Sequence, residues 1–465
     1  MVTRRQADVV VAGGGMAGLC ASLAALEENA SVITLEKGPR SGGSMRISGG
    51  LIWTFINKPQ LREMIPDGNP ILQDLVLDNL WEGLDWLEGH GVALEKTRDM
   101  MGHGRGRAAT SAAQLAEVLA DRVRALGGEI AMETPLDTLL YEDGAVRGVH
   151  ACGPGGAIEI QAGAVVLATG GFQGNPELLV RYVTPLVEKV YLRSNPWSTG
   201  DGLIAATQIG AAVTPGMPGF YGHSLPAPPA SFGPDEFLEV TQRYGPVAVA
   251  INLDGHRFVD ESAGTGEECL NQAMASQRDA TAIYIVDGET AEAPLQYGPP
   301  ARIQIERLRG RGGPVIESET LEELCAALED WGVHGPRAML TLNEYNNALR
   351  QGQAGQLVPP RRGNLFPLAK PPFIAVAVRS GVTFTSGGLE VDADMRVLRR
   401  STSSSTLPLT IADHSEVRFN TIPNLYAAGC DLGNISNGGY IGGLATALTT
   451  GRPAGRGAAI CARSG

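Results

Sequence analysis

The sequence predicts an α/β fold in which a domain with a parallel sheet is built from two separated parts of the chain, with an α+β domain inserted between them. The first observation is a strand, glycine-rich loop, helix and strand in order at the N-terminus. The second is a pair of later apolar strands, ending near residues 168 and 428, that each run into glycines. The third is a Pro- and Gly-rich change of composition near Gly222, before a region with helical patterns.

Composition and charge narrow the class of protein before any motif is considered. With 465 residues, 43% hydrophobic and 19% charged, the chain can bury a large core in two or three domains. A net charge of −13 argues against nucleic-acid binding, and no apolar run approaches the roughly 18 residues of a membrane span. Six cysteines without C-x-x-C spacing indicate neither a metal site nor a disulfide framework, so a reducing cytoplasm is expected.

The N-terminal segment "ADVVVAGGGMAGLCASLAALEENASVITLEK" carries the clearest motif. An apolar strand at residues 9–11 runs into Gly13, Gly15 and Gly18 in G-x-G-x-x-G spacing, and a second strand ends at Glu36. Glycines permit a tight turn and close approach of a pyrophosphate, which the helix N-terminus stabilises, while the acid accepts hydrogen bonds from a ribose. The order of strand, loop, helix, strand and acid predicts a Rossmann-type dinucleotide site rather than a chance glycine turn.

Three further segments distinguish FAD from NAD as the dinucleotide. "KGPRSGGSMRISGGLIW" is a second glycine-rich segment directly after Glu36, and "AGAVVLATGGFQGN" is an apolar strand that ends in Ala168, Thr169 and Gly170. "IPNLYAAGCDLGN" is another strand, which runs into a glycine and then Asp431, whose carboxylate suits ribityl hydroxyls. An NAD domain needs none of these, so they favour FAD.

With these segments identified, the chain resembles the flavoprotein family of fumarate reductases and succinate dehydrogenases, which includes 3-ketosteroid Δ1-dehydrogenases and tricarballylate dehydrogenase-like enzymes. The resemblance rests on eight segments in the family's order: "VVVAGGGMAG", "GGSMRISGG", "VVLATGG", "STGDGLIAA", "INLDGHRFVDES", "GVTFTSGGLEVD", "NLYAAGCD" and "YIGGLATALTTGRPAG". It implies an FAD domain from residues 1–221 and 372–465, with a capping domain at 222–371. A Ser-rich stretch, "RRSTSSSTLP", is expected to be an exposed loop.

The glycine segments and the resemblance together give the residues expected to contact FAD. Covalent relatives use a histidine in the second glycine segment, and "RSGGSMRISGG" has none, so dissociable, non-covalent FAD is expected. The expected contacts are Gly13, Gly15, Met16, Ala17, Gly18, Glu36, Lys37, Gly42, Gly43, Ser44, Ser48, Gly49, Gly50, Ala168, Thr169, Gly170, Thr199, Gly200, Asp201, Gly429, Asp431, Gly443, Leu444 and Ala445.

Three positions where the dicarboxylate reductases of this family carry cationic substrate ligands are neutral in this chain. An arginine of the C-terminal glycine loop is replaced by Tyr440, an arginine after the "RF-x-x-E" segment by Thr265, and a histidine before "GGL" by Thr383. An arginine matches a carboxylate and stays charged, whereas Tyr and Thr offer single neutral hydrogen bonds. Succinate and fumarate are therefore disfavoured as substrates.

Tyr440 is instead similar to the tyrosine of the ketosteroid dehydrogenases that polarises the substrate ketone. A neutral phenol donates a hydrogen bond to a carbonyl as negative charge develops, and Gly443 of the same loop is counted with the catalytic residues. A packing role for Tyr440 is the alternative. Two departures from that branch are a threonine where it has a tyrosine base, at Thr265, and a shorter loop after the tyrosine.

A proton must also be moved, so a base or a relay is expected. His223 matches a family histidine that lines the substrate cavity, and is expected to act as a base or an orienting donor, with a structural histidine as the alternative. Weaker substrate contacts are His103 and Arg105, which a solvated loop explains equally well, and Arg379, which precedes the substrate-edge segment. Glu267 and Glu268 suit either a hidden base or helix capping, and Arg257 with Glu261 suits a structural ion pair.

The leading hypothesis is an FAD-dependent oxidoreductase that dehydrogenates the α,β carbons of a carbonyl-activated substrate, or reduces the alkene in reverse, by hydride transfer with flavin N5. A cyclic ketone or ketosteroid-like compound is the first expectation, and a tricarballylate- or fumarate-like carboxylate is the alternative. A flavin-binding electron-transfer protein or non-catalytic paralogue is an alternative of another class, and a flavin monooxygenase or amine oxidase is disfavoured. Without iron–sulfur or haem motifs, electrons must pass to a diffusible or protein acceptor.

Overall fold

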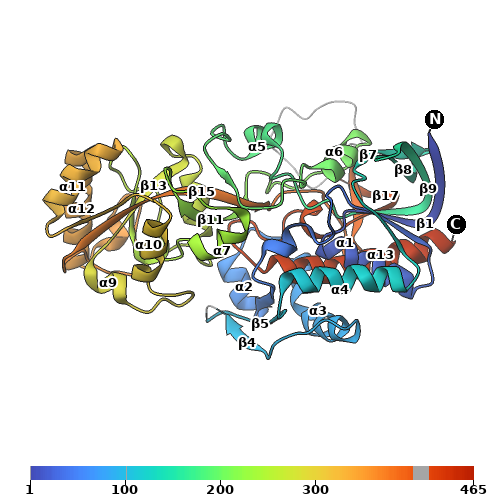
Figure 1. The fold of residues 1–465 in the computed structure, drawn as a ribbon, viewed down its shortest axis with the longest axis horizontal. Helices are drawn as coiled ribbons and strands as arrows, with labels where there is room; N and C mark the ends of the chain where they lie inside the picture. The colour runs from blue at the N-terminus through green and yellow to red at the C-terminus, as the bar shows by residue number, and fades with distance from the viewer. Residues whose placement is uncertain (1, 101, 402–417, 465) are drawn as a thin grey trace.

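The computed structural model describes residues 2–100, 102–401 and 418–464, and most of the predicted Ser-rich loop lies outside them. The molecule is elongated, with one large sheet toward each end (Figure 1). Both termini lie at the end that holds strands β1 (Thr3–Ala12) and β9 (Gly156–Leu167). Helices α11 (Leu321–Ala327) and α12 (Gly335–Arg350) lie at the opposite end.

The eight-stranded sheet is assembled from the two ends of the chain. Its order is β16–β17–β9–β1–β2–β6, with β8 paired to β9 and β7 paired to β8. Val10 of β1 pairs in parallel with Ile33 and Val165, and Leu425 pairs in parallel with Val165. The predicted α/β fold with a discontinuous parallel-sheet domain is therefore confirmed. The remaining strands are β2 (Val32–Leu35), β6 (Glu129–Ala131), β7 (Leu136–Glu142), β8 (Ala145–Gly153), β16 (Arg396–Ser401) and β17 (Arg418–Ala427).

Two helices from opposite ends of the sequence cover one face of this sheet together. Helix α1 (Met16–Glu27) packs closely on α13 (Gly443–Ser464). A Cβ at Gly451 would lie 2.4 Å from the carbonyl oxygen of Ala17, and one at Gly455 would lie 2.0 Å from that of Ala21. Only glycine allows such close backbone contact, so these residues join the two parts of the domain.

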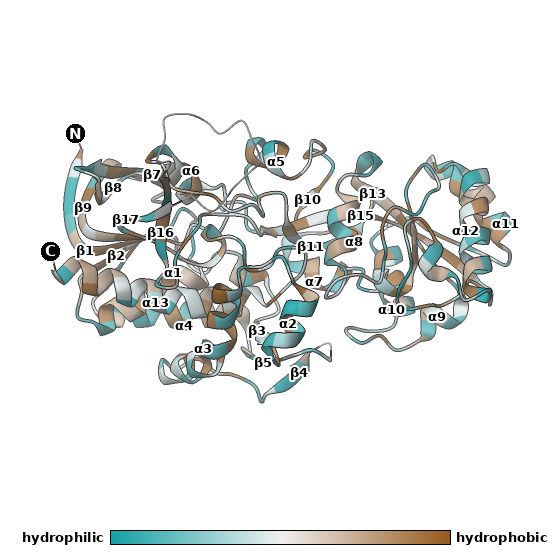
Figure 2. Ribbon diagram, turned by 180° about the vertical axis from the view of Figure 1, so that it is seen from behind, coloured by the Kyte–Doolittle hydropathy of each residue, from teal (hydrophilic) through white to brown (hydrophobic). Residues whose placement is uncertain are grey.

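Shorter elements complete this half, and polar side chains begin several of its helices. Asn69 caps α3 (Pro70–Gly89) by accepting from the backbone N–H groups of Ile71 and Leu72, and Ser111 caps α4 (Ala112–Ala125) by accepting from that of Gln114. In Figure 2, β2 and the C-terminal part of β1 are brown, whereas α4 carries both brown and teal. The other elements are β3 (Leu51–Phe55), β4 (Arg98–Met100), β5 (Gly104–Ala108), α2 (Lys58–Met64), α5 (Pro176–Tyr182) and α6 (Asp201–Gln208).

The capping half is a six-stranded sheet centred on β15 (Phe373–Thr385). This strand pairs with β10 (Tyr191–Leu192), β11 (Phe220–Pro226), β13 (Thr281–Val286) and β14 (Val315–Ser318). The predicted helical patterns at residues 319–332 and 341–352 form α11 and α12. Because β10 and β15 come from outside the predicted cap limits of 222 and 371, the two halves share a continuous junction. The other elements are β12 (Val249–Ile251), α7 (Phe237–Val240), α8 (Glu268–Met274), α9 (Gly288–Glu292) and α10 (Ala301–Gly310).

A buried ion cluster stabilises the cap, as predicted for the "INLDGHRFVDES" segment. Glu261 Oε2 lies 2.5 Å from Arg257 Nη2 and 2.9 Å from Arg361 Nη1, and all three side chains are almost fully buried. The arginines also donate to backbone carbonyls, so the charges are both paired and hydrogen-bonded. In the described part of the chain, no helix is both long enough and apolar enough to cross a membrane.

Candidate active site

A cavity of about 550 Å³ lies where the carboxyl ends of the parallel strands meet the cap. Ligands of open α/β sheets bind at this edge. The cavity wall includes all four predicted catalytic residues. Of the predicted FAD contacts, those that line the cavity are Gly13, Gly15, Met16, Ala17, Glu36, Lys37, Gly42, Gly43, Ser44, Ser48, Gly49, Ala168, Thr169, Gly170, Asp201, Gly429, Gly443 and Leu444.

The first glycine loop leaves room for a ligand on one side and none on the other. Gly13 has φ +114°, and a Cβ there would lie 2.1 Å from the carbonyl oxygen of Ala168. A Cβ at Gly18 would lie 1.7 Å from the carbonyl oxygen of Gly13, so this glycine packs the helix onto the loop, away from the cavity. A Cβ at Gly15 would have no neighbour within 4 Å. The open side, at the N-terminus of α1, suits a pyrophosphate.

Glu36 is fixed at the end of β2 by two backbone donors. Its Oε2 accepts from the N–H of Gly14 at 2.9 Å, and its Oε1 accepts from the N–H of Gly38 at 2.6 Å. Burial raises the pKa of this carboxyl, while the two donors oppose that shift. Glu36 therefore has a set orientation on the cavity wall, at the position that binds a ribose in this type of fold.

Six predicted FAD contacts lie just outside the cavity wall: Gly18, Gly50, Thr199, Gly200, Asp431 and Ala445. Asp431 accepts hydrogen bonds from the backbone N–H and the hydroxyl of Thr169, which separates it from the cavity. Burial raises the pKa of Asp431 to about 6. Thr199 hydrogen-bonds Asp201, which lies 3.0 Å from Lys37, so Thr199 supports two residues that line the cavity.

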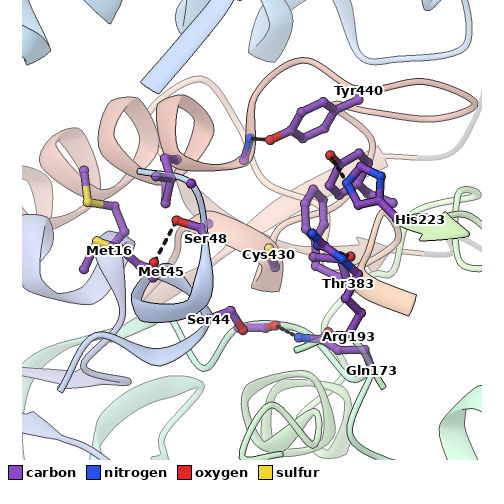
Figure 3. A pocket seen from close by; sticks show the side chains of 18 of the residues that line it. Met16, Ser44, Met45, Ser48, Gln173, Arg193, His223, Thr383, Cys430 and Tyr440 are labelled. Atoms are coloured by element: carbon purple, nitrogen blue, oxygen red, sulfur yellow. Dashed lines mark hydrogen bonds between the residues drawn. The ribbon is translucent and has the colours of Figure 1, made fainter. Parts of the chain in front are cut away.

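The donor set and the shape of this half fit FAD. The glycine loop accepts a pyrophosphate, Glu36 accepts from a ribose, and the second glycine segment, with Ser44 and Ser48, continues along the same wall. Figure 3 shows Met16, Met45 and Ser48 on one side of the pocket, with Tyr440 and His223 on the other. The space between the two sides is bounded by the cofactor segments and by the cap.

Tyr440 is held in the cavity wall through its backbone, its ring and its hydroxyl. Its Oη accepts from the backbone N–H of Gly443 at 3.1 Å, at the start of α13. Its own N–H donates to Thr265 Oγ1 at 3.0 Å, and that hydroxyl donates to Glu268 Oε2 at 3.1 Å. Thr265 therefore positions the glycine loop. Burial raises the pKa of Tyr440 to about 12, so the phenol stays protonated at neutral pH.

His223 lies between a phenol and a carboxyl group. Its Nε2 is 2.7 Å from Tyr221 Oη, and its Nδ1 hydrogen-bonds Glu267 Oε1. Burial lowers the pKa of His223 well below its usual value and raises that of Glu267 well above it, so both groups favour their neutral forms. Glu267 stands at the N-cap of α8 but makes no capping hydrogen bond with its side chain. The capping interpretation is therefore wrong for this residue.

Two arginines, Arg193 and Arg243, line the cavity, although neutral residues replace the family's three cationic ligands. Arg193 Nη1 donates to Thr383 Oγ1 at 3.2 Å, beside the position of the family histidine. Arg193 is only 7% exposed. Within the described chain, its Nε has no hydrogen-bond partner and its guanidinium forms no ion pair with a carboxylate. Burial lowers its pKa, with a further contribution from Arg243, which also lines the cavity. This side of the site is therefore cationic.

The weaker substrate candidates divide into two groups. His103 and Thr383 line the cavity, and the ring of His103 stacks on Phe55 with centroids 5.0 Å apart. Arg105 and Arg379 lie outside the cavity wall: Arg105 pairs with Asp99 at 3.0 Å, and the guanidinium of Arg379 lies over the ring of Tyr191. Both guanidinium groups therefore interact with residues of the protein outside the cavity wall.

Sequence reasoning missed Tyr221, Arg193 and Arg243 as residues of the site. Tyr221 stands two residues before His223 in β11, where alternate side chains share one face, but no strand was predicted there. Nothing in the sequence indicated the arginines. Arg193 precedes β11 by about thirty positions and is brought to the cavity by the pairing of β10 with β15, which is a long-range contact.

Residues 8–444 match the protein family described as FAD binding domain. The chain is 26% identical to urocanate reductase of Eggerthella lenta, over 98% of this chain and 75% of that protein. It is also 26% identical to fumarate reductase (cytochrome) of Shewanella frigidimarina, over 97% of this chain and 77% of that protein. The crystal structure of 3-ketosteroid Δ1-dehydrogenase from Sterolibacterium denitrificans has the same fold, with a TM-score of 0.74, 19% identity and coverage of 98% and 100% of the two chains.

The matched family covers both the glycine loop and the Tyr440 loop, and the cavity that they enclose has the shape and donor set for FAD. The chain therefore belongs to the FAD binding domain family, as an FAD-dependent oxidoreductase of the fumarate reductase and ketosteroid dehydrogenase type that acts on CH–CH groups.

Proposed function

We propose that this enzyme dehydrogenates the α,β carbons of a cyclic ketone or ketosteroid-like compound, or reduces the corresponding enone, with non-covalently bound FAD. The observation that carries the proposal is the hydrogen bond from the N–H of Gly443 to Tyr440 Oη (3.1 Å). Because the phenol oxygen accepts there, its own proton is left to donate, and a carbonyl oxygen in the cavity is a suitable acceptor. Bound FAD supplies the exchange of the hydride.

Charge at this point of the site supports a role in enolisation. Gly443 is the first residue of α13, and the N-terminus of a helix stabilises negative charge. A phenol with a pKa of about 12 remains a neutral donor, which matches a carbonyl oxygen that gains partial negative charge in the transition state. Electrons would then pass to a diffusible or protein acceptor.

A specific observation favours a second candidate, a tricarballylate- or fumarate-like carboxylate. Arg193 is buried beside Thr383, and no carboxylate in the described chain forms an ion pair with it. A buried guanidinium of this kind favours an anionic ligand, because an unpaired buried charge is unfavourable. The three neutral replacements therefore do not remove every cation from the site.

Anaerobic visible spectroscopy of the FAD-bound protein tests both candidates. Cyclic ketones, 3-ketosteroids and di- or tricarboxylates are added to the oxidised enzyme, and the corresponding enones and fumarate to the reduced enzyme. Bleaching or recovery of the flavin band with ketones or enones, lost in Tyr440→Phe, is the expected result. A response to carboxylates alone, lost in Arg193→Gln, would support the second candidate. No response to any of these compounds would contradict both.

A further inference from the structure

Tyr221, His223 and Glu267 form a continuous hydrogen-bonded chain that ends at the cavity. Tyr221 Oη lies 2.7 Å from His223 Nε2, and His223 Nδ1 bonds Glu267 Oε1. His223 is 9% exposed and Glu267 is 5% exposed, while Tyr221 is half-buried in the cavity wall. All three residues line the cavity, and Tyr221 is the least buried of them, so we take its phenol as the member of the chain that meets a ligand and the carboxyl group as the other end.

We infer that Tyr221 is the catalytic acid and base of this enzyme, and that His223 and Glu267 are positioning residues that carry its proton. The inference rests on the proposed function, because it concerns the proton that leaves or joins the carbon next to the activating group. Hydrogen-bonded side-chain chains of this kind transfer protons over several ångströms without leaving a charge on the central members.

The place of Tyr221 beside Tyr440 supports this assignment. The two rings stack with centroids 3.8 Å apart and planes inclined by 11°. A carbonyl group held by Tyr440 has its α carbon one bond from the carbonyl carbon, and the neighbouring phenol belongs to the same wall. Thr265, at the position of the tyrosine base in the ketosteroid branch, is engaged with Tyr440 and Glu268 instead.

The proton transfers balance in the reducing direction. The O–H bond of Tyr221 breaks as the substrate C–H bond forms, and the proton on His223 Nε2 moves to the phenol oxygen. The proton on Glu267 moves to His223 Nδ1, so that the negative charge ends on the carboxylate. One proton leaves the chain, and with the hydride from FAD it converts C=C into CH–CH. Dehydrogenation follows the same steps in reverse.

The surroundings of Glu267 are suited to both states of the relay. Burial favours the protonated carboxyl, and Glu268 acts in the same direction, whereas the guanidinium groups of Arg243 and Arg193 favour the carboxylate. The charged or titratable groups that face the chain are Arg193, Arg243, Glu268, Tyr284 and Tyr440. The two arginines therefore stabilise the charge that forms when the relay gives up its proton.

A test that needs no substrate uses nuclear magnetic resonance of the FAD-bound protein with ¹⁵N-labelled histidine. The His223 resonances are assigned from their loss in His223→Gln. We expect Glu267→Gln to shift the Nδ1 resonance and Tyr221→Phe to shift the Nε2 resonance. Tyr426→Phe removes a hydroxyl that donates to the carbonyl oxygen of Gly457 outside the cavity, and is expected to move neither. If the His223 resonances shift in neither Glu267→Gln nor Tyr221→Phe, the relay is overturned.

A kinetic test uses two probes, which separates the relay from the proposed substrate class. Cyclohexanone deuterated at its α carbons reports exchange with water by mass spectrometry, and fumarate reports reoxidation of the reduced flavin. With either probe that the wild type converts, Tyr221→Phe is expected to slow the reaction by about 10²–10⁴-fold, and Tyr426→Phe to leave the rate unchanged. Undiminished turnover in Tyr221→Phe would overturn the relay.

The outcomes also distinguish failure of the proposed function from failure of the relay. Conversion of fumarate without exchange of cyclohexanone contradicts the ketone substrate, and the fumarate rates then decide the role of Tyr221. If the wild type converts neither cyclohexanone nor fumarate, the proposed function is contradicted for both compounds. The His223 resonances are then the test that decides whether the relay exists. Equal losses in Tyr221→Phe and Tyr426→Phe indicate a structural effect and contradict the assignment.

Discussion

The rings of Tyr221 and Tyr440 lie face to face, with centroids 3.8 Å apart and an interplanar angle of 11°. Tyr221 comes from β11 at the start of the cap, whereas Tyr440 comes from the loop before α13. The stack therefore joins the cap to the C-terminal part of the FAD-binding half at the cavity itself. The two hydroxyls have different partners, His223 for one and the N–H of Gly443 for the other, which gives the phenols different chemical roles.

Replacing Tyr440 by Phe is expected to slow ketone-dependent bleaching of the flavin by about 10²–10³-fold, because a donor to the developing oxyanion is lost. The ring and its stack on Tyr221 remain, so FAD binding is expected to be unchanged. Anaerobic stopped-flow absorbance measures the rate, and Tyr426→Phe, outside the cavity, is the matched control. A rise in the ketone concentration needed for half-maximal rate, with the maximal rate intact, would argue against transition-state stabilisation.

Replacing Glu267 by Gln is expected to change the pH dependence of the reaction. Burial raises the pKa of Glu267, so the relay is loaded with its proton below that pKa and loses it as pH rises through it. The wild-type rate of alkene reduction should therefore fall with rising pH, while the rate of dehydrogenation rises. Gln cannot titrate, so this dependence should disappear. The measurement is the flavin rate across pH, and a variant that keeps the wild-type profile would exclude Glu267 as its source.

Replacing Arg193 by Gln is expected to weaken binding of carboxylates by about tenfold or more, since a charge-assisted hydrogen bond is lost. Ketone binding should change much less. Flavin difference spectra measure both affinities, and Arg379→Gln is the matched control, because that guanidinium lies over Tyr191 outside the cavity. Equal weakening by the two substitutions would mean that Arg193 acts only through the overall charge of the protein.

Local patterns predicted the part of the site that binds the cofactor. Gly13, Gly15 and Glu36 lie on short, continuous segments whose spacing determines their geometry, and all three line the cavity. His223 and Tyr440 were also predicted as site residues, because each stands in a segment that resembles the corresponding segment of the family, and both line the cavity. In these cases the sequence holds the relevant neighbours within a few residues.

The cationic side of the site could not be predicted, because it depends on contacts between distant segments. Arg193 reaches Thr383 across 190 residues, through a short parallel pairing of β10 with β15. Position-by-position comparison with the family recorded a histidine lost at Thr383 but not an arginine gained beside it. The contact between His223 and Glu267 spans 44 residues and was missed for the same reason.

Asp431 is expected to make the protein less stable as pH rises. Its pKa is raised from 3.8 to about 6, so its contribution to stability is present below the usual pKa and is lost as pH rises through about 6. The loss is on the order of 3 kcal/mol, from about 1.4 kcal/mol for each pKa unit. Urea denaturation of the FAD-saturated protein measures it. Asp431→Asn should lack this component, whereas Asp137→Asn, at an exposed strand position, should retain it.

Replacing Glu261 by Gln is expected to destabilise the cap by about 3–5 kcal/mol, because two buried arginines lose their only carboxylate within the described chain. Glu289→Gln is the matched control: Glu289 pairs with Lys370 at 2.7 Å, but both side chains are more than half exposed, so its loss should change stability by less than about 1 kcal/mol. Urea denaturation compares the two variants. The ion cluster lies outside the cavity wall, so any Glu261→Gln protein that remains folded should keep the wild-type flavin spectrum. A changed spectrum at full folding would show that the cluster also shapes the active site.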